Sequence, residues 1–325
     1  MQNTLNNINR EKAHIEFLRI LGCLLTIYIF VENIANSTTR NSILTLFYYP
    51  SACIFFMISG CVLLSKKESL KDVWIKRILR IGFIILGVSF LILIYRRDYD
   101  FFSWPHKILF NNVNPYLGFL YVYVIDMICL PFLRTVTRKL SKKNFAYILI
   151  LKVIWKIVLD IANSAEIIYL PYLNLLFIII NSILYMLIGH WVENVIDIFY
   201  NIRYVDICLS IIIGISVLSC FVTKLHLLDD LVFISTFLLV KILFQKYPPT
   251  AKNRKIICLG GSLTFGIYLL IGPTQILQNG ISILYSNGFT IAAMVGTIVL
   301  FIIYGLIVFV LKRIPGLGRI VEWFI

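Results

Sequence analysis

Residues 289–311 read FTIAAMVGTIVLFIIYGLIVFVL, an uninterrupted run without a charged side chain, and Lys312 and Arg313 follow directly. An α-helix rises about 1.5 Å per residue, so a helix of this length covers the hydrocarbon core of a bilayer, which is about 30 Å thick. Apolar residues follow one another continuously here and do not alternate with polar ones. The stretch therefore predicts a membrane-spanning helix that ends at a basic pair.

Nine further runs of similar length and apolarity fill most of the remaining chain. They cover approximately residues 15–35, 44–64, 78–95, 116–133, 145–161, 169–191, 204–222, 227–244 and 256–277. Continuous runs of this length exclude a transmembrane β-barrel, whose strands alternate between apolar and polar residues. We therefore expect an all-α polytopic membrane protein, a bundle of about ten transmembrane helices. Residues 1–325 are expected to form a single domain without a separate soluble domain.

The composition supports the same class. Apolar residues make up 60% of the chain and charged residues only 14%, whereas a soluble domain carries about 25% charged residues. A soluble globule of this size needs more polar surface than these residues provide. Soluble enzymes, secreted disulfide scaffolds, disordered proteins and nucleic-acid binders are excluded on this ground.

The positive charge is distributed unevenly between the two sides of the predicted bundle. With ten spans both termini lie on one side, and about two thirds of the 30 Lys and Arg residues fall in segments on that side. Cytoplasmic segments of membrane proteins carry such an excess. We therefore expect both termini in the cytoplasm. The net charge of +14 then needs no nucleic-acid partner, and the lipid bilayer is the expected partner.

Several charged residues fall inside the predicted spans, where an ionised side chain costs about 2.5–3.5 kcal/mol on insertion scales. They include Arg19, Glu32, Arg80, Asp126 and the series Lys152, Lys156 and Asp160, which recurs every four residues along one helix face. Each has a plain structural explanation, such as snorkelling to lipid headgroups, an ion pair between helices or exposure to the outer water. Together they favour a polar cavity through the bundle.

Metal and cofactor signatures are not apparent in the sequence. The four histidines are scattered and the seven cysteines lie in apolar runs without a CxxC pair, so no metal site is predicted. Phosphate-loop, zinc-protease and serine-hydrolase motifs are not found either. We expect no bound cofactor. The pair Gly260-Gly261 is interpreted as the entry to a helix.

Several short stretches resemble one family of membrane proteins in their order along the chain. The first is EFLRILGCLLTIYIF at residues 16–30, and FFMISG at residues 55–60 leads to KRILR at residues 76–80. YLGFLY at residues 116–121, LPFLR at 130–134, YMLIGHWVEN at 185–194 and TFGIYLLIGP at 264–273 follow. These stretches resemble the acyltransferase family 3 integral membrane proteins, the membrane O-acyltransferases of surface glycans.

The resemblance implies an activity and a location. Members of this family transfer an acetyl group from cytoplasmic acetyl-CoA to a hydroxyl of a cell-surface or lipid-linked glycan. The chain is then expected in a bacterial cytoplasmic membrane, with a glycan or lipid-linked sugar as acceptor. Usage rich in isoleucine, asparagine and lysine also hints at an AT-rich bacterial genome.

The sequence departs from the family at three positions. Arg19 is present, but Phe30, Tyr116 and Ile271 stand where the family usually has histidine. A histidine is the natural general base near neutral pH, and neither phenylalanine nor isoleucine moves protons. Two interpretations stay open: an acyltransferase, or a catalytically degenerate member that acts in binding, export or assembly of a surface polysaccharide.

The candidate site residues follow from this comparison. Arg19, Glu32 and Tyr116 are the candidate catalytic residues, although Glu32 points away from the direction of Phe30 and a tyrosine with a pKa near 10 is a poor base. Arg77 and Arg80 are the candidate contacts to the phosphates of acyl-CoA, because arginine suits phosphate recognition. Snorkelling to lipid headgroups explains these two residues equally well.

Overall fold

The computed structural model describes residues 13–35, 50–95, 100–110, 117–141, 144–145, 147–148, 150–155, 158, 171–195, 206–214, 229–271, 281–283 and 290–314. Within these ranges every regular element is a helix and none is a strand. Tyr116, Lys156 and Asp160 lie outside the described residues, and so does the side chain of Glu32, whose backbone belongs to the first helix.

The all-helical class predicted from the sequence is confirmed for the described part. The principal helices are α2 (Ala13–Ala35), α4 (Pro50–Leu63), α8 (Gly118–Lys139), α10 (Pro171–Val195), α13 (Asp229–Lys246), α14 (Ala251–Ile271) and α16 (Thr290–Arg313). A continuous rod is formed by α5 (Leu70–Val73), the π-helical turn η1 (Trp74–Leu79) and α6 (Arg80–Tyr95), and the short α7 (Trp104–Phe110) follows it. Among the described residues, five helical segments are long and apolar enough to cross a membrane.

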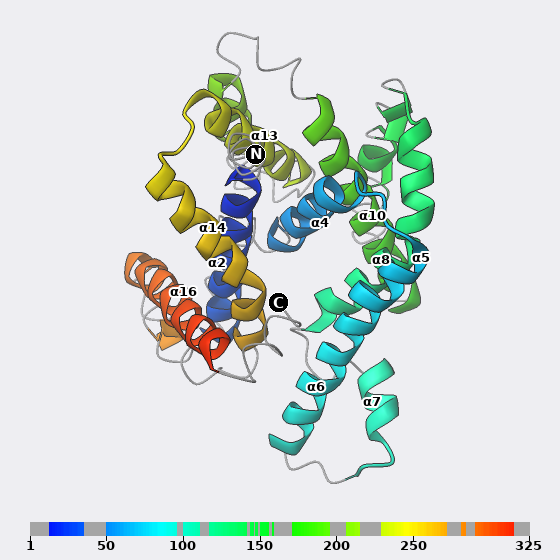
Figure 1. Ribbon diagram of the computed structural model, residues 1–325, viewed down its shortest axis with the longest axis vertical. Coiled ribbons are helices and arrows are strands. Elements are labelled where there is room, and N and C mark those ends of the chain that lie inside the picture. The colour runs from blue at the N-terminus through cyan, green and yellow to red at the C-terminus, as the bar shows by residue number, and fades with distance from the viewer. Residues whose placement is uncertain are drawn as a thin grey trace.

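The helices form two groups that meet along α2 and α4. Figure 1 shows α2, α14 and α16 on one side of the molecule and α4, α6, α8 and α10 on the other. Apolar side chains of α2, α14 and α16 form one core cluster. A second, larger cluster joins α4, α8, α10 and α13. The packing of α2 against α4 connects the two groups.

The tightest packing in the described part occurs where α4 crosses α10. A β-carbon at Gly60 would overlap the backbone carbonyl oxygen of Met186, and one at Gly189 would overlap the backbone carbonyl oxygen of Met57. The thiol of Cys61 donates a hydrogen bond to the carbonyl of Gly189 at 3.0 Å. Small residues allow helix backbones to approach this closely inside membranes. The two glycines therefore set the separation of α4 and α10.

A second close contact joins α14 to α2. A β-carbon at Gly261 would overlap a carboxylate oxygen of Glu16. Gly260 and Gly261 lie in the middle of α14, which begins at Ala251. Their interpretation as a helix entry is therefore wrong, because the polar residues 251–255 already belong to the helix. Here glycine provides room for a neighbouring helix.

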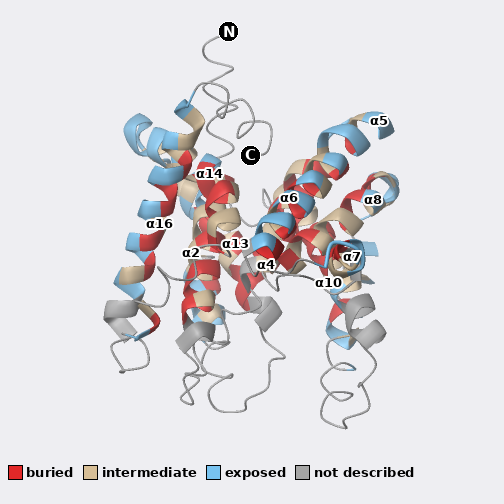
Figure 2. Cartoon of the chain, turned by 90° about the horizontal axis from the view of Figure 1, so that it is seen from below, coloured by how far each residue is buried: buried red, intermediate tan, exposed pale blue. Residues whose placement is uncertain are grey.

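The outward faces of several helices carry large apolar side chains. Figure 2 shows exposed residues along the outer sides of α6 and α16. On α16 they are Met294, Val295, Ile298, Val299, Ile302, Ile303, Leu306, Ile307 and Val310. An apolar surface of this extent is unfavourable in water and favourable against lipid. The protein is therefore a multi-pass membrane protein.

The glycine contact predicts a difference between two alanine substitutions. We expect Gly60→Ala to destabilise the protein by about 3 kcal/mol, the upper end of overpacking costs, because backbone atoms cannot rotate away. Gly87→Ala on α6 is the matched control, since a β-carbon there meets nothing within 4 Å. Thermal unfolding in detergent measures both variants. Equal stability of the two would contradict the close crossing of α4 and α10.

Candidate functional site

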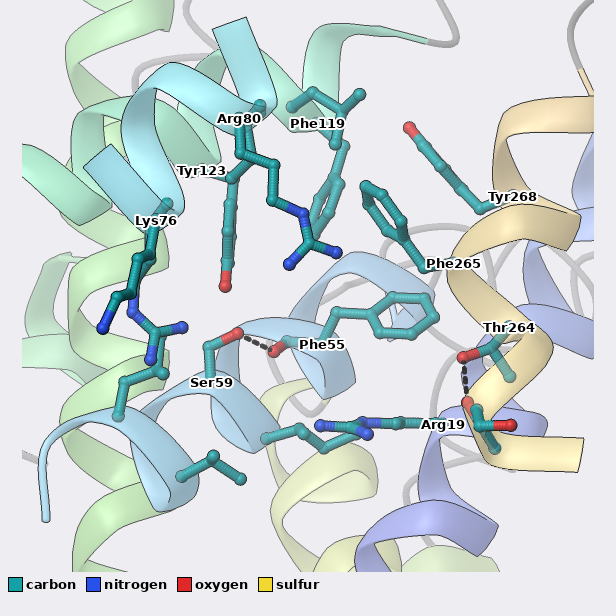
Figure 3. A pocket seen from close by; sticks show the side chains of 18 of the residues that line it. Arg19, Phe55, Ser59, Lys76, Arg80, Phe119, Tyr123, Thr264, Phe265 and Tyr268 are labelled. Atoms are coloured by element: carbon teal, nitrogen blue, oxygen red, sulfur yellow. Dashed lines mark hydrogen bonds between the residues drawn. The ribbon is translucent and has the colours of Figure 1, made fainter. Parts of the chain in front are cut away.

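A cavity of about 490 Å³ lies between the two helix groups (Figure 3). Its walls come from α2, α4, η1, α6, α8, α14 and the end of α16. Segments that are far apart in the sequence therefore contribute to one chamber. Arg19 reaches it from α2, and Arg80 reaches it from the opposite wall at the start of α6 (Figure 3).

The cavity is strongly basic. Its cationic lining residues are Arg19, Lys66, Lys76, Arg77, Arg80 and Lys312, and no carboxylate is among the described lining residues. The sequence predictions Arg19, Arg77 and Arg80 are thus brought together in one place. Their roles in catalysis and acyl-CoA binding stay predictions. Lys66 and Lys312 were not predicted, because a lysine at the end of a span is most simply explained by the positive-inside rule.

Three of these cations have a carboxylate partner just outside the cavity. Arg19 donates to Glu16 on the same helix at 2.8 Å, and the other carboxylate oxygen of Glu16 is buried without a hydrogen-bond partner. Lys76 pairs with Asp72 at 2.7 Å, an exposed contact between residues one turn apart. Arg77 pairs with Glu68 at 2.6 Å.

Arg80 differs from these three residues. Within the described part of the chain its guanidinium has no ion pair and no hydrogen bond. Figure 3 shows it extending into the cavity between Tyr123 and Phe265. A guanidinium in a semi-enclosed chamber without a counterion is a favourable place for an anion, which restores the interactions lost on leaving water.

The cation of Arg77 is held by a network at the loop between α4 and α5. Glu68 accepts from Arg77 Nη2 at 2.6 Å and Nε at 3.1 Å, and from Arg134 Nη2 at 3.0 Å. Hydrogen bonds from the Arg77 guanidinium and then from Arg134 lower the pKa of Glu68 from 4.5 to about 2. The carboxylate therefore stays ionised at any physiological pH.

An aromatic wall faces the cations. Phe119 of α8 is its centre, with ring centroids 5.8 Å from Phe55, 5.9 Å from Tyr123 and 5.8 Å from Tyr268. Phe265 completes the wall from α14 (Figure 3). The site therefore combines positive charge with flat apolar surfaces, which suits a ligand with phosphates and an uncharged portion.

Phe30 and Ile271, two of the positions where the sequence resemblance implies histidine, lie in an apolar environment. Ile271 is fully buried in the cluster formed by α2, α14 and α16, and Phe30 packs against the same cluster. Neither residue is among those that line the cavity. Phe30 and Ile271 thus both contribute apolar contacts to one hydrophobic core.

Of the other predicted interior charges, Asp126 and Lys152 are the two whose side chains the structure describes, and neither lines the cavity. Asp126 is buried and accepts a hydrogen bond from Ser182 at 2.8 Å. Lys152 donates to Asn181 of α10 at 2.9 Å, and its ammonium lies 3.6 Å from the centre of the Tyr185 ring. These contacts favour the structural explanation, in which polar residues join neighbouring helices.

The fold and this cavity define a class, that of multi-pass membrane proteins with a basic chamber between their helices. The family model of the acyltransferase domain matches residues 13–312. The chain therefore belongs to acyltransferase family 3, as its sequence motifs predicted. No curated protein and no solved structure matches it.

The network at Glu68 predicts a pH-dependent contribution to stability. The folded-state pKa of about 2 lies below the ordinary 4.5, so the stabilisation is present above pH 4.5 and is lost as the pH falls towards 2. We expect Glu68→Gln to lower the free energy of unfolding by roughly 1–3 kcal/mol at neutral pH. Thermal unfolding in detergent from pH 7 to pH 2.5 should show the two proteins converge.

Asp72→Asn is the control, because the Asp72–Lys76 pair is exposed and contributes little. A difference between wild type and Glu68→Gln that stays constant down to pH 2.5 would contradict the network.

Proposed function

We propose that the protein transfers an acetyl group from cytoplasmic acetyl-CoA to a hydroxyl of a cell-surface or lipid-linked glycan, in a bacterial cytoplasmic membrane. Membership of acyltransferase family 3 supports the reaction class. The observation that carries the proposal is the guanidinium of Arg80, which lies in a basic cavity and has no ion pair or hydrogen bond among the described residues. CoA bears phosphate and diphosphate groups, which arginine binds with charge-assisted hydrogen bonds.

The two ends of acetyl-CoA match the two kinds of wall. Phosphates fit among Arg80, Lys66, Lys76 and Lys312, and the uncharged pantetheine and acyl portion fits beside the aromatic residues around Phe119. The excess of Lys and Arg in the predicted cytoplasmic segments supports entry of the donor from the cytoplasm.

The reaction balances without a further reagent. The acceptor oxygen attacks the thioester carbonyl carbon, the C–S bond breaks, the CoA thiolate leaves, and the proton of the acceptor hydroxyl ends on that sulfur. A donor near the carbonyl oxygen stabilises the negative charge that develops there. Arg19 is the proposed donor, because its guanidinium enters the cavity from the side of α2 (Figure 3). Glu32 and Tyr116 stay the proposed bases.

One observation favours a second candidate, a catalytically degenerate member that binds a ligand in export or assembly of a surface polysaccharide. Phe30 and Ile271, which stand where the sequence resemblance implies histidine, lie in or against one apolar cluster. The described lining residues include hydroxyls, such as those of Tyr123 and Tyr268, and no histidine. Ligand binding needs only the cations, which are retained.

Release of ester-linked acetate from the cell-surface glycan tests the proposed transfer. We expect mild alkali to release less acetate from cells that lack the gene, and from knockout cells that carry Arg19→Ala or Arg80→Ala. Arg138→Ala is a matched control, because Arg138 is an exposed residue at the end of α8 that does not line the cavity. Unchanged acetate together with altered glycan export would overturn the transfer and favour the second candidate.

Restoring a histidine separates the two candidates. If the chain is an active enzyme, Phe30→His leaves ester acetate unchanged or lowers it, because an imidazole beside an apolar cluster is poorly solvated. That is the expected result. A gain of acetylation in Phe30→His, measured in the same knockout cells at equal protein level, would show instead that the natural chain lacks a base.

A further inference from the structure

Arg77 and Arg80 lie one turn apart and both line the cavity, yet their surroundings differ. Glu68 engages Arg77 through two hydrogen bonds, a bidentate contact that fixes the plane of the guanidinium. Arg80 makes no such contact within the described residues. The sequence alone assigns both residues the same role, whereas their contacts in the structure indicate two different roles.

The carboxylate of Glu68 is itself held from a third helix. The side chain of Arg134 on α8 is only 7% exposed and donates to Glu68 Oε2 at 3.0 Å. It also donates from Nε to the carbonyl of Leu63, the last residue of α4, at 3.0 Å. One guanidinium therefore ties the end of α4 to the loop that carries Glu68.

This network ends at the helical segment from which Arg80 projects. The rod passes from α5 into the π-helical turn η1, and Arg77 lies in this turn just before Arg80. A π-turn is rare and occurs mostly as a single turn inside an α-helix. Glu68 holds the guanidinium of Arg77 in this turn through two hydrogen bonds. Because the rod is continuous, a contact that restrains Arg77 also restrains the helix at Arg80, one turn further on.

We propose that Glu68 is a positioning residue for anion binding, which anchors Arg77 against Arg134 so that Arg80 is the arginine of this helix that binds the ligand phosphate. This inference rests on the proposed function, since it concerns the same cavity. Arg77 then has a structural role, because Glu68 neutralises its charge whether or not a ligand is bound.

The sign of one mutational effect distinguishes this proposal from simple electrostatics. Glu68→Gln removes a negative charge near a basic cavity, so Coulomb attraction alone predicts tighter binding of a polyanion. If Glu68 positions Arg80, the same variant binds CoA about tenfold more weakly, because a misplaced guanidinium loses charge-assisted hydrogen bonds to phosphate. In the acetyl-transfer reaction KM should rise by a similar factor while kcat changes little.

The experiment is calorimetric titration of the full-length protein in lipid nanodiscs with CoA and, separately, with inorganic pyrophosphate. Asp72→Asn is the charge-matched control, because it removes a carboxylate beside the cavity-lining Lys76 without touching the network. It should bind both anions as tightly as wild type or more tightly. Glu193→Gln is the stability control, since Glu193 pairs with Lys241 and His14 and none of these residues lines the cavity.

Each outcome decides the proposal. Weaker binding in Glu68→Gln alone supports it, and binding as tight as or tighter than that of wild type overturns it while the proposed function stands. Equal weakening in Glu193→Gln attributes the effect to general instability and also overturns it. A folded wild type that binds neither anion overturns both the proposed function and this inference. Should Glu68→Gln fail to fold, Glu68→Asp, which keeps the charge but shortens the reach, should bind more weakly than wild type.

Discussion

The arrangement of the cavity depends on the backbone contact between α4 and α10 at Gly60 and Gly189. In lipid there is little hydrophobic drive for helices to associate, so close packing at small residues provides much of the attraction. The contact holds α4 in place, and the other side of α4 presents Phe55 and Ser59 to the cavity. The end of α4 then leads into the loop with Glu68. The position of α4, which the two glycines set, therefore also determines where the charged side chains at its end lie.

Concentrating six cations around one chamber costs free energy through mutual repulsion and desolvation. The chain offsets part of this cost with carboxylates that pair with three of the six cations. Glu16 and Asp72 each lie about one helical turn before the cation that they neutralise. Glu68 lies on the loop that precedes the helix of Arg77. They lie behind the cations and not in the cavity, so the electrostatic field inside stays positive. Arg80 is left without a partner among the described residues, so its charge is the least compensated one on this helix.

The sequence predicted the helical class well because a long, continuous apolar run can form few structures other than a membrane-spanning helix. It also predicted Arg19, Arg77 and Arg80 as site residues, and the fold brings them to one cavity. It did not predict Glu68 or Arg134, because both lie at span ends, where charged residues are ordinary. Their importance comes from a contact between residues 66 positions apart, which no local pattern encodes. The role of Gly261 was misread for the same reason, since its partner Glu16 lies on another helix.

The cavity and the apolar cluster beside it differ in what holds them together. Among the cations, Arg19, Lys76 and Arg77 each pair with a carboxylate, and Arg80 has no such partner among the described residues. Ile271, by contrast, belongs to a continuous apolar core against which Phe30 packs. An apolar core tolerates apolar substitutions of similar volume, whereas removal of one partner of a largely buried ion pair such as Arg134–Glu68 leaves a charge without compensation. The buried part of the cation network is therefore more sensitive to the loss of a single side chain than the apolar core around Ile271.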